Sequence, residues 1–276
     1  MPGKKSLNIV WLKRDIRTQD HQPLEEAEKD GLPYLVIYLF EPSQIAHPDT
    51  SIRHLQFIFH SLLDFNEKML DYSRRAEIFH AEAEEAFNFI AEQYDIKTVF
   101  SYEEHGTQHS WDRDKAIGRY FESKNITWKE YKKNGVVRGV SNRDGWDKQW
   151  YKTVNEPLVV NQYTKSDLPF LEHPYELNFQ FEQSIYEYPS AYQPAGETYA
   201  WKYLHSFTDG RGSDYYKYIS KPELSRVSCG RVSVYLAWGN LSIKQAYQHI
   251  RFHENYVHNK RAFQGILTRF KWHCHF

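Results

Sequence analysis

The first half of the chain alternates short apolar runs with longer stretches in which apolar residues recur every three or four positions. The short runs are rich in β-branched and aromatic residues, which predicts β-strands at 8–12, 34–40, 77–81, 98–102 and 127–131. Helical periodicity is clearest over 53–70, whose apolar stripe consists of Leu55, Ile58, Leu62, Phe65 and Met69. Residues 82–94 and 110–124 are the next two helical stretches. This alternation predicts βαβ units, a parallel sheet and right-handed crossovers.

The pattern changes in the second half of the chain. From about 133 to 195 the periodicity breaks down among Gly, Pro and Asn residues, which is typical of a long connection between domains. Helical patterns return over 196–207, 233–239, 241–257 and 261–276. In the third of these, Ser242 and Gln245 have the spacing of a capping box. We therefore expect a doubly wound parallel-sheet domain over 1–132, an interdomain connection over 133–195 and the first part of an all-helical domain over 196–276.

The composition indicates a globular protein in a reducing compartment. Hydrophobic residues make up 41% of the 276 residues and charged residues 26%. The two cysteines, Cys229 and Cys274, lack CxxC spacing and cannot form a disulfide framework. The first apolar run is too short for a signal peptide, and no segment approaches the roughly 20 apolar residues of a membrane span. We expect a cytoplasmic protein with no membrane partner.

Charge and aromatic content leave two interpretations open. Residues 221–276 carry nine Lys or Arg and two Glu, a charge of +7. Because the net charge of the whole chain is −1, residues 1–220 carry −8. A basic segment of this kind forms either an anion-binding face or a solvated pair of basic helices. The aromatic share of 17% serves either packing or the stacking of planar ligands.

Several common sites are disfavoured. Residues 13–21, which follow the first predicted strand, contain no glycine, so neither a GxGxxG turn nor a GxxxxGK[ST] loop is present there. This argues against a dinucleotide dehydrogenase and a P-loop nucleotidase. His249 and His253 stand four residues apart on a predicted helix, but no HExxH motif accompanies them, so we interpret them as helix-surface histidines rather than metal ligands. No GxSxG motif is present.

The most informative stretch surrounds residues 228–239. Gly230 frees the backbone for an unusual turn, Ser233 has the chemistry to cap a helix that begins there, and Arg231 adds a permanent charge. Exposed amides, a helix dipole and a guanidinium together bind phosphate or pyrophosphate. An ordinary capped helix with a surface arginine is the competing interpretation.

Four blocks of the sequence resemble DNA photolyases and cryptochromes. GRVSVYLAWGNLS (230–242) resembles the TSRLSPYLxxGxxS block of that family, and IVWLKRDIRTQDHQPL (9–24) resembles its opening hxWFRxDLRxxDNxAL. Residues 53–69 resemble its RxxFLxxSLxDLxxxL helix, and 196–207 its GExxAxxxLxxF helix. The blocks occur in the family's order and span nearly the whole chain, so together they are specific.

This resemblance implies a function. The family has an N-terminal α/β antenna domain and a C-terminal helical domain that holds FAD. Photolyases repair pyrimidine dimers in DNA with light: the dimer is flipped out of the duplex and split by an electron from reduced FAD. The resemblance therefore implies a deoxyribodipyrimidine photo-lyase, a carbon–carbon lyase that acts as a monomer on damaged DNA. Cryptochromes supply the alternative, a blue-light sensor or a flavin- or antenna-binding protein without repair activity.

The resemblance also assigns cofactor-binding residues. Arg231, Val232 and Ser233 match the block that holds the FAD phosphates, with Gly230 where the family often has Ser. Tyr215, or Tyr216 beside it, matches the tyrosine on the phosphate side of the flavin.

A second, antenna chromophore is implied as well. His47 falls near one family antenna contact, and Tyr102 and Glu103 lie in VFSYEEH (99–105), where many members place others. The competing interpretation is a strand end with solvated carboxylates. Neither the resemblance nor the spacing identifies catalytic residues or a metal site.

The last eight residues, RFKWHCHF (269–276), depart from the family's ExxWRExxY. Trp272 is kept, but Arg269 stands at the glutamate position and His273 at the arginine position. By the resemblance all three border the flavin and lesion cavity, so the chain looks like a divergent member. Because members continue well beyond this block, we expect a C-terminally truncated form. On its own it should hold little FAD and be inactive. Successive helical residues point about 100° apart, so His273, Cys274 and His275 would not share a metal ion.

Overall fold

The structure, a computed structural model, describes residues 3–138 and 142–275. The chain divides into two compact units, each described here by itself. The α/β unit consists of Met1–Tyr131 and Val159–Gly196, and the helical unit consists of Lys132–Leu158 and Glu197–Phe276. Residues 133–195, expected as a connection, are therefore shared between the two units.

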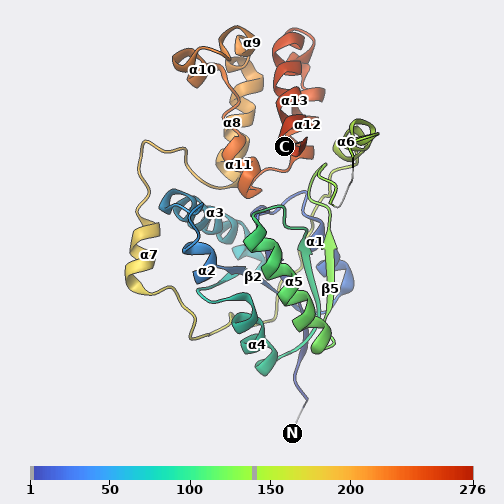
Figure 1. The fold of residues 1–276 in the computed structure, drawn as a ribbon, viewed down its shortest axis with the longest axis vertical. Helices are drawn as coiled ribbons and strands as arrows, with labels where there is room; N and C mark the ends of the chain where they lie inside the picture. Colours follow the sequence, from blue (N-terminus) through green and yellow to red (C-terminus); the bar gives the residue numbers. More distant parts are fainter. Residues whose placement is uncertain (1–2, 139–141, 276) are drawn as a thin grey trace. The chain divides into compact units, whose positions relative to one another are not determined.

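The α/β unit is built on a five-stranded sheet with the order β3-β2-β1-β4-β5 (Figure 1). Every neighbouring pair of strands is parallel. The strands are β1 Ser6–Leu12, β2 Tyr34–Leu39, β3 Ala76–Phe79, β4 Asp95–Tyr102 and β5 Thr127–Tyr131. All five predicted strands are present with ends that differ by a few residues, which confirms the parallel α/β sheet.

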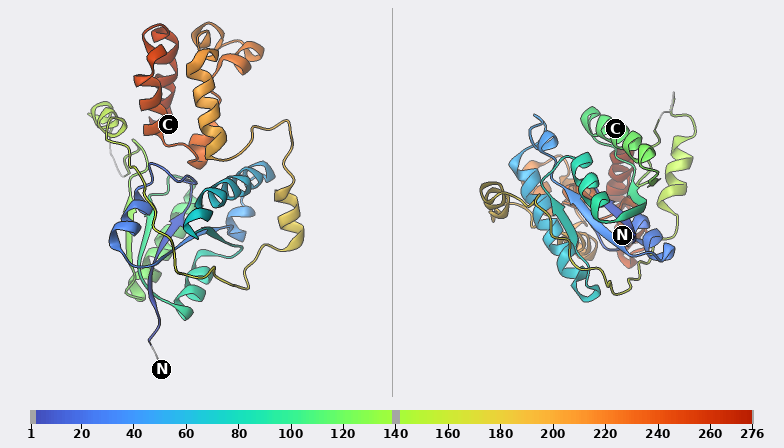
Figure 2. Two further views of the ribbon diagram at one scale, coloured as in Figure 1. Left: turned by 180° about the vertical axis from the view of Figure 1, so that it is seen from behind. Right: turned by 90° about the horizontal axis from the view of Figure 1, so that it is seen from below.

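Helices cover both faces of this sheet (Figures 1 and 2). α1 (Gln22–Asp30) and α3 (Ile52–Met69) lie on one face, and α4 (Ala83–Gln93) and α5 (Gln108–Ser123) lie together on the other. Right-handed crossovers require this arrangement for the observed strand order. The unit also contains α2 (Pro42–Ile45), η1 (Leu70–Tyr72) and α7 (Phe179–Tyr186). The predicted helices over 53–70, 82–94 and 110–124 are confirmed.

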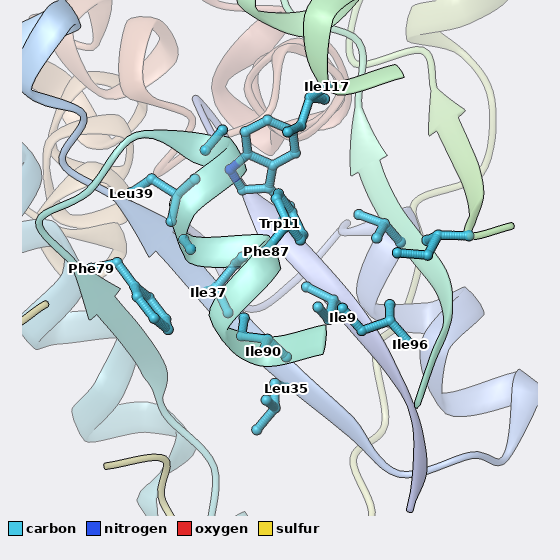
Figure 3. Close-up of a cluster of buried hydrophobic side chains, with 14 of the residues drawn as sticks. Ile9, Trp11, Leu35, Ile37, Leu39, Phe79, Phe87, Ile90, Ile96 and Ile117 are labelled. Carbon is cyan, nitrogen blue, oxygen red and sulfur yellow. The ribbon is translucent and has the colours of Figure 1, made fainter. Parts of the chain in front are cut away.

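The core between the sheet and α4 and α5 explains the apolar runs of the first half. Side chains from β1 and β2 meet those of the two helices (Figure 3); they include Ile9, Trp11, Leu35, Ile37, Leu39, Phe87, Ile90 and Ile117. The Trp11 ring packs edge-on against Phe87 with ring centroids 5.2 Å apart. Since helices bury both faces, β1 and β2 are buried along nearly their whole length and show no alternation of apolar and polar residues.

Residues 159–196 form a strap that is hydrogen-bonded to the α/β unit. Asp20 Oδ1 accepts the Val159 amide at 3.0 Å, and the Asn161 side chain donates to the His21 carbonyl at 2.8 Å. Farther along, the Leu171 amide donates to Glu77 at 2.9 Å. These bonds join residues about a hundred positions apart and follow no period. For this reason the apolar residues of this segment show no regular spacing in the sequence.

The helical unit contains the second group of predicted helices. Its elements are α6 Trp146–Val154, α8 Glu197–Ser206, η2 Phe207–Arg211, α9 Tyr215–Tyr218, α10 Pro222–Ser228, α11 Ser233–Trp238, α12 Ile243–Phe252, η3 Glu254–Tyr256 and α13 Lys260–His275. The predicted capping box of Ser242 and Gln245 is confirmed at the start of α12. α6 was not predicted, although it buries Trp150 and Val154.

A buried pair, Asp15 and His21, fixes the start of α1. His21 is the N-cap, and its Nδ1 accepts the Leu24 amide at 3.2 Å. Nε2 must therefore carry the proton that is donated to Asp15 Oδ2 at 2.8 Å. Burial lowers the pKa of His21 from its ordinary value, because a second proton on Nδ1 would be buried and would break the cap. The pKa of Asp15 is lowered too: burial opposes its ionisation, but the hydrogen bonds from His21 and the Lys13 amide outweigh it.

His21→Asn is expected to lower the free energy of unfolding at pH 8 by about 1–3 kcal/mol, because asparagine keeps the cap but leaves Asp15 without its imidazole donor. Folding depresses the His21 pKa, so in the parent chain this residue's contribution is present above the ordinary pKa of 6.5 and is lost as the pH falls toward the folded value. The variant should lack that acid-side loss. Urea unfolding between about pH 8 and pH 5 measures both effects.

The exposed His258 provides a control, since His258→Asn removes a histidine outside the pair. An unchanged pH dependence in His21→Asn would contradict the assignment.

Candidate functional site

Gly230, in the loop before α11, is needed because there is no space for a side chain, and not because of its backbone conformation. The prediction that Gly230 makes the unusual turn is wrong, because the residue in the left-handed region is Arg231, with φ of 56°. Gly230 has no room for a side chain: a Cβ there would lie 2.4 Å from Ile266 Cδ1 on α13. The glycine thus lets the loop approach α13 closely, and Arg231 takes up the backbone strain.

Ser233 does not cap α11, so that prediction is also wrong. Val232 is the N-cap residue, and it is buried. Ser233 is instead the first residue of a six-residue helix, and its side chain is exposed. The backbone of Val232, with φ −97° and ψ −1°, is not the extended conformation of a usual N-cap, and no side chain caps the helix. The Ser233 hydroxyl faces outward beside a half-buried Arg231.

Tyr215 joins two groups of residues that the sequence placed apart. It is 5% exposed, and Arg269 on α13 is hydrogen-bonded to its side chain. The same guanidinium lies 4.1 Å from the ring centroid of Trp272. Burial raises the pKa of Tyr215, so the phenol stays protonated. The predicted phosphate-side tyrosine, Arg269 and Trp272 therefore form one contiguous cluster.

Tyr216, the other candidate for this position, has a different environment. It is 52% exposed, and the Arg261 guanidinium stacks on its ring at 3.8 Å. Its neighbour Tyr215 packs so closely on α13 that a Cβ on Gly265 would lie 3.2 Å from the tyrosine ring. Tyr215 is thus the tyrosine that is fixed relative to α13.

Trp272 also lines an aromatic cavity of about 390 Å³ within the helical unit. The other aromatic residues of this aromatic cavity are Trp146, Trp150, Tyr151, Tyr247 and His275. Lys271 and Asp147, an ion pair at 2.6 Å, line it too. The α6 residues were missed because their region read as a connection. Trp146, Trp150 and Val154 are spaced four residues apart, and this spacing was the available signal for one helical face.

The last residues of the chain continue α13, as predicted for a helix. Cys274 is buried, His273 is exposed, and the His275 ring lies 5.0 Å from that of Trp146. His273 is not among the residues that line the aromatic cavity with Trp272. Phe276 lies outside the described residues.

His249 and His253 lie side by side on the helical unit, with ring centroids 5.3 Å apart. His249 Nε2, however, is hydrogen-bonded to the Thr208 hydroxyl at 3.0 Å. In the part of the chain that the structure describes, no three His, Cys, Asp or Glu side chains are grouped so that they would hold a metal ion. Within 3–138 and 142–275, moreover, no helix has the length and apolar character needed to cross a membrane.

The three predicted antenna residues each have different partners in the α/β unit. The buried Tyr102 hydroxyl accepts the Gln22 amide at 2.9 Å and is also hydrogen-bonded to Arg17 and to the Asp20 carbonyl. These three bonds use its full capacity, so Tyr102 ties β4 to the start of α1. Glu103 pairs with His105 at 3.3 Å.

His47 stacks on His109, with ring centroids 5.7 Å apart. His109 was not among the residues predicted for this site. The two rings form a small planar surface beside the residues that follow the strands, where ligands of parallel sheets usually bind.

A buried polar cluster follows the strands at the same edge of the sheet. Glu41, after β2, forms an ion pair with Arg113, and Lys13, after β1, pairs with Asp114 at 3.0 Å. Burial raises the pKa of Glu41 despite its arginine partner. Among the described residues, the buried side-chain atoms without a hydrogen-bond partner include Glu41 Oε1, Gln44 Nε2 and His109 Nε2. Charged residues directly after apolar strands were the signal that the sequence offered.

Gly230→Ala is expected to lower the free energy of unfolding by about 1–3 kcal/mol, because the new methyl group would overlap Ile266 Cδ1. Ile266→Val removes that same methyl group and should by itself cost about 0.5–1.5 kcal/mol. The double variant should then be more stable than the sum of the two losses predicts. Denaturant unfolding of all four proteins measures this coupling, and strict additivity would contradict the close approach.

The comparisons with known proteins agree with this architecture. The family model for DNA photolyase matches residues 8–155, more than half of the chain. A curated cryptochrome DASH from Synechocystis is 26% identical over 114 residues, which are 40% of this chain and 23% of that protein. A curated deoxyribodipyrimidine photo-lyase from Alkalihalophilus pseudofirmus is 22% identical over 272 residues, or 91% of this chain and 55% of the relative.

Solved structures share the fold at low identity. A Synechocystis cryptochrome has a TM-score of 0.81 at 19% identity, covering 99% of this chain and 61% of its own. A class III photolyase from Agrobacterium tumefaciens has a TM-score of 0.79 at 17% identity, with coverages of 99% and 58%. An archaeal photolyase from Sulfolobus tokodaii, solved with two FAD molecules, has a TM-score of 0.70 at 21% identity, with coverages of 91% and 56%.

The chain thus spans about half the length of the photolyase relative and three fifths of the solved structures at most. The resemblance that four sequence blocks indicated is confirmed by the family match and by the shared fold. The chain belongs to the DNA photolyase and cryptochrome family.

Proposed function

We propose that this chain is part of a flavoprotein that repairs pyrimidine dimers in DNA with light, using an electron from reduced FAD. Family membership supports the class of protein. The observation that carries the proposal within this chain is the strained Arg231, a non-glycine residue in the left-handed region at the segment that matches the family's phosphate-binding block. Such strain persists where the surroundings enforce it, and it is concentrated at functional sites.

The residues of this segment fit a phosphate group. Arg231 brings a permanent charge on a half-buried side chain, and the Ser233 hydroxyl is exposed beside it. Arg231 in the left-handed region followed by Val232 near the right-handed region turns successive amides toward one side, which makes a concave site for an anion. Arg231, Val232 and Ser233 would therefore hold the FAD phosphates, with Tyr215 nearby on α9. FAD, when bound, supplies light absorption and the transferred electron.

The aromatic cavity supports the DNA partner. A dimer flipped out of the duplex needs aromatic surfaces to replace its lost stacking, and Trp272, Trp146 and Tyr151 provide them. The exposed Lys260 and Arg261 at the start of α13 carry charge suited to the phosphate backbone. We assign Trp272 to stacking on the lesion, and not to proton transfer, because an indole has no titratable group in the physiological range.

We further propose an antenna chromophore at the carboxyl edge of the sheet. The stacked His47 and His109 offer a planar surface. The unpartnered buried atoms of Glu41, Gln44 and His109, counted within the described residues, offer both donors and an acceptor. Glu103 follows β4 directly and is a further candidate contact. The hydroxyl of Tyr102 is already hydrogen-bonded to the Gln22 amide. A flavin is one suitable chromophore, since the archaeal photolyase was solved with two FAD molecules.

A light sensor without repair activity is the second candidate, and Arg269 is the observation that favours it. Where the family has glutamate, this guanidinium contacts Tyr215 and Trp272. A guanidinium has no acceptor, so it cannot make the hydrogen bonds that a carboxylate makes to a lesion. His273 likewise replaces the family's arginine and is exposed.

The two candidates separate in one experiment. The protein is purified from its complete reading frame, its flavin absorbance is recorded, and it is illuminated with DNA that contains pyrimidine dimers. Repair together with bound flavin supports the photolyase. Flavin without repair supports the sensor, and a protein without flavin would rule out both.

Arg231→Gln is expected to weaken flavin retention by about tenfold or more, because it removes the charge of the phosphate-binding segment and its charge-assisted hydrogen bonds. The exposed Arg226 on α10 gives a matched control of equal charge loss, and Arg226→Gln should retain flavin as the parent does. Flavin stoichiometry after gel filtration measures the effect. Equal loss in the two variants would point to net charge and away from a site.

Trp272→Ala is expected to weaken binding of dimer-containing DNA by about 5- to 150-fold, the range that corresponds to losing one base–aromatic stack of about 1–3 kcal/mol. Affinity for undamaged DNA should change little, because the backbone contacts remain. Fluorescence anisotropy with damaged and undamaged oligonucleotides measures both. Trp111→Ala, at another exposed tryptophan, is the control. A parallel loss on both DNAs would contradict the stacking role.

A further inference from the structure

We propose that Arg211 is a positioning residue that holds the segment 227–233 in its phosphate-binding shape. This inference depends on the proposed function for the identity of the ligand, but the contacts that carry it lie within the helical unit. Arg211 does not belong to any of the sequence blocks that indicated the family.

The Arg211 guanidinium gathers the backbone carbonyls at the end of α10. One nitrogen, Nη1, donates to the Val227 carbonyl at 2.9 Å and to the Cys229 carbonyl. The other, Nη2, lies 3.4 Å from the Gly230 carbonyl. The last carbonyls of a helix have no partner within it, so a cation at this place satisfies them and also complements the helix dipole.

The other side of the guanidinium is bound to α8. Nη2 donates to the Tyr203 carbonyl at 3.0 Å, and Nε donates to Ser206 Oγ at 3.0 Å. Arg211 therefore links α8 to the loop after α10 through a single rigid plane. Only the fork of an arginine offers five donors in this geometry.

The core fixes Arg211 itself. It ends the π-helical turn η2, in which Gly210 has φ of 156°. Gly212 follows, and a Cβ there would lie 2.6 Å from the Phe207 ring. The Phe207 ring in turn packs on those of Tyr215 and Phe263, with centroids 5.7 and 5.4 Å away. The backbone from which the Arg211 side chain extends is therefore restrained by this packing.

The consequence for the loop follows from the planar peptide bond. In a trans peptide the carbonyl and the following amide point in opposite directions. When Arg211 holds the carbonyls of Cys229 and Gly230, the amides of Gly230 and Arg231 must point away from it. The chain then enters the left-handed conformation at Arg231. Arg211 thereby orients these peptide groups so that their carbonyl oxygens point away from the proposed phosphate and their amide N–H groups point toward it.

Packing alone does not hold this loop. α10 is seven residues long, and Leu224 and Val227 on it are 46% and 66% exposed. Gly230 and Val232 are buried, but they lie beyond the end of the helix. With so little apolar burial on α10, the hydrogen bonds of Arg211 restrain the carbonyls of Val227, Cys229 and Gly230.

The test compares Arg211→Ala and Arg211→Lys with the control Arg226→Ala in the full protein. Inorganic pyrophosphate is the probe, titrated by calorimetry into flavin-free protein, and amide hydrogen exchange over 229–233 reports the shape of the loop. We expect Arg211→Ala to bind pyrophosphate about tenfold more weakly and to exchange these amides faster. Arg211→Lys should lie between it and the parent, because an ammonium cannot reach all the carbonyls at once. Arg226→Ala should match the parent in both measurements.

Added guanidinium ion should restore pyrophosphate binding to Arg211→Ala but not to Arg231→Ala, a rescue that a general loss of stability would not show. If Arg211→Ala fails to fold, Arg211→Lys supplies the same comparison. Parent-like affinity and parent-like exchange in the Arg211 variants would overturn the positioning role. A parent protein that binds no pyrophosphate would instead overturn the proposed phosphate site, and faster exchange in the Arg211 variants would still support the hold on the loop.

Discussion

Irregular backbone in this protein is held by hydrogen bonds to side chains outside the segment itself. Backbone amides and carbonyls that leave helices and strands must find other partners, or their burial costs free energy. In the α/β unit, Asp20 and Asn161 attach the strap of residues 159–196 beside the start of α1. In the helical unit, Arg211 binds the carbonyls after α10. The proposed phosphate site at Arg231 directly follows the carbonyls that Arg211 binds, so the positions of its amides depend on these hydrogen bonds.

The two units offer different chemistry. The edge of the sheet in the α/β unit presents buried charges, Glu41 with Arg113 and Lys13 with Asp114, beside the stacked His47. This environment suits a polar planar ligand held by hydrogen bonds. The helical unit instead presents a left-handed turn at Arg231 and an aromatic cavity, which under the proposed function would bind a dinucleotide and an unstacked base.

In the sequence alignment that we propose, Arg269 stands where the family pattern has a glutamate. A glutamate in its place would bring a negative charge and only acceptors, whereas the guanidinium brings a positive charge and only donors. It connects the Tyr215 side chain to the face of Trp272, so the substitution links the phosphate side of the proposed site to its aromatic side. Exchange of one residue would therefore alter the charge, the hydrogen bonding and the orientation of the tryptophan together.

Elements whose residues repeat along one face could be predicted from the amino-acid order alone. This order predicted the five strands, α3 and the capping box of Ser242 and Gln245, because burial of one face leaves a local period. Arg231 could also be identified from the sequence, because it lies in a block of residues that resembles a sequence motif of the family. By contrast, the reason why Gly230 is a glycine, the histidine that stacks on His47 and the partners of Arg211 became evident in the folded chain. These facts depend on contacts between elements far apart in the chain, and such contacts leave no period in the sequence.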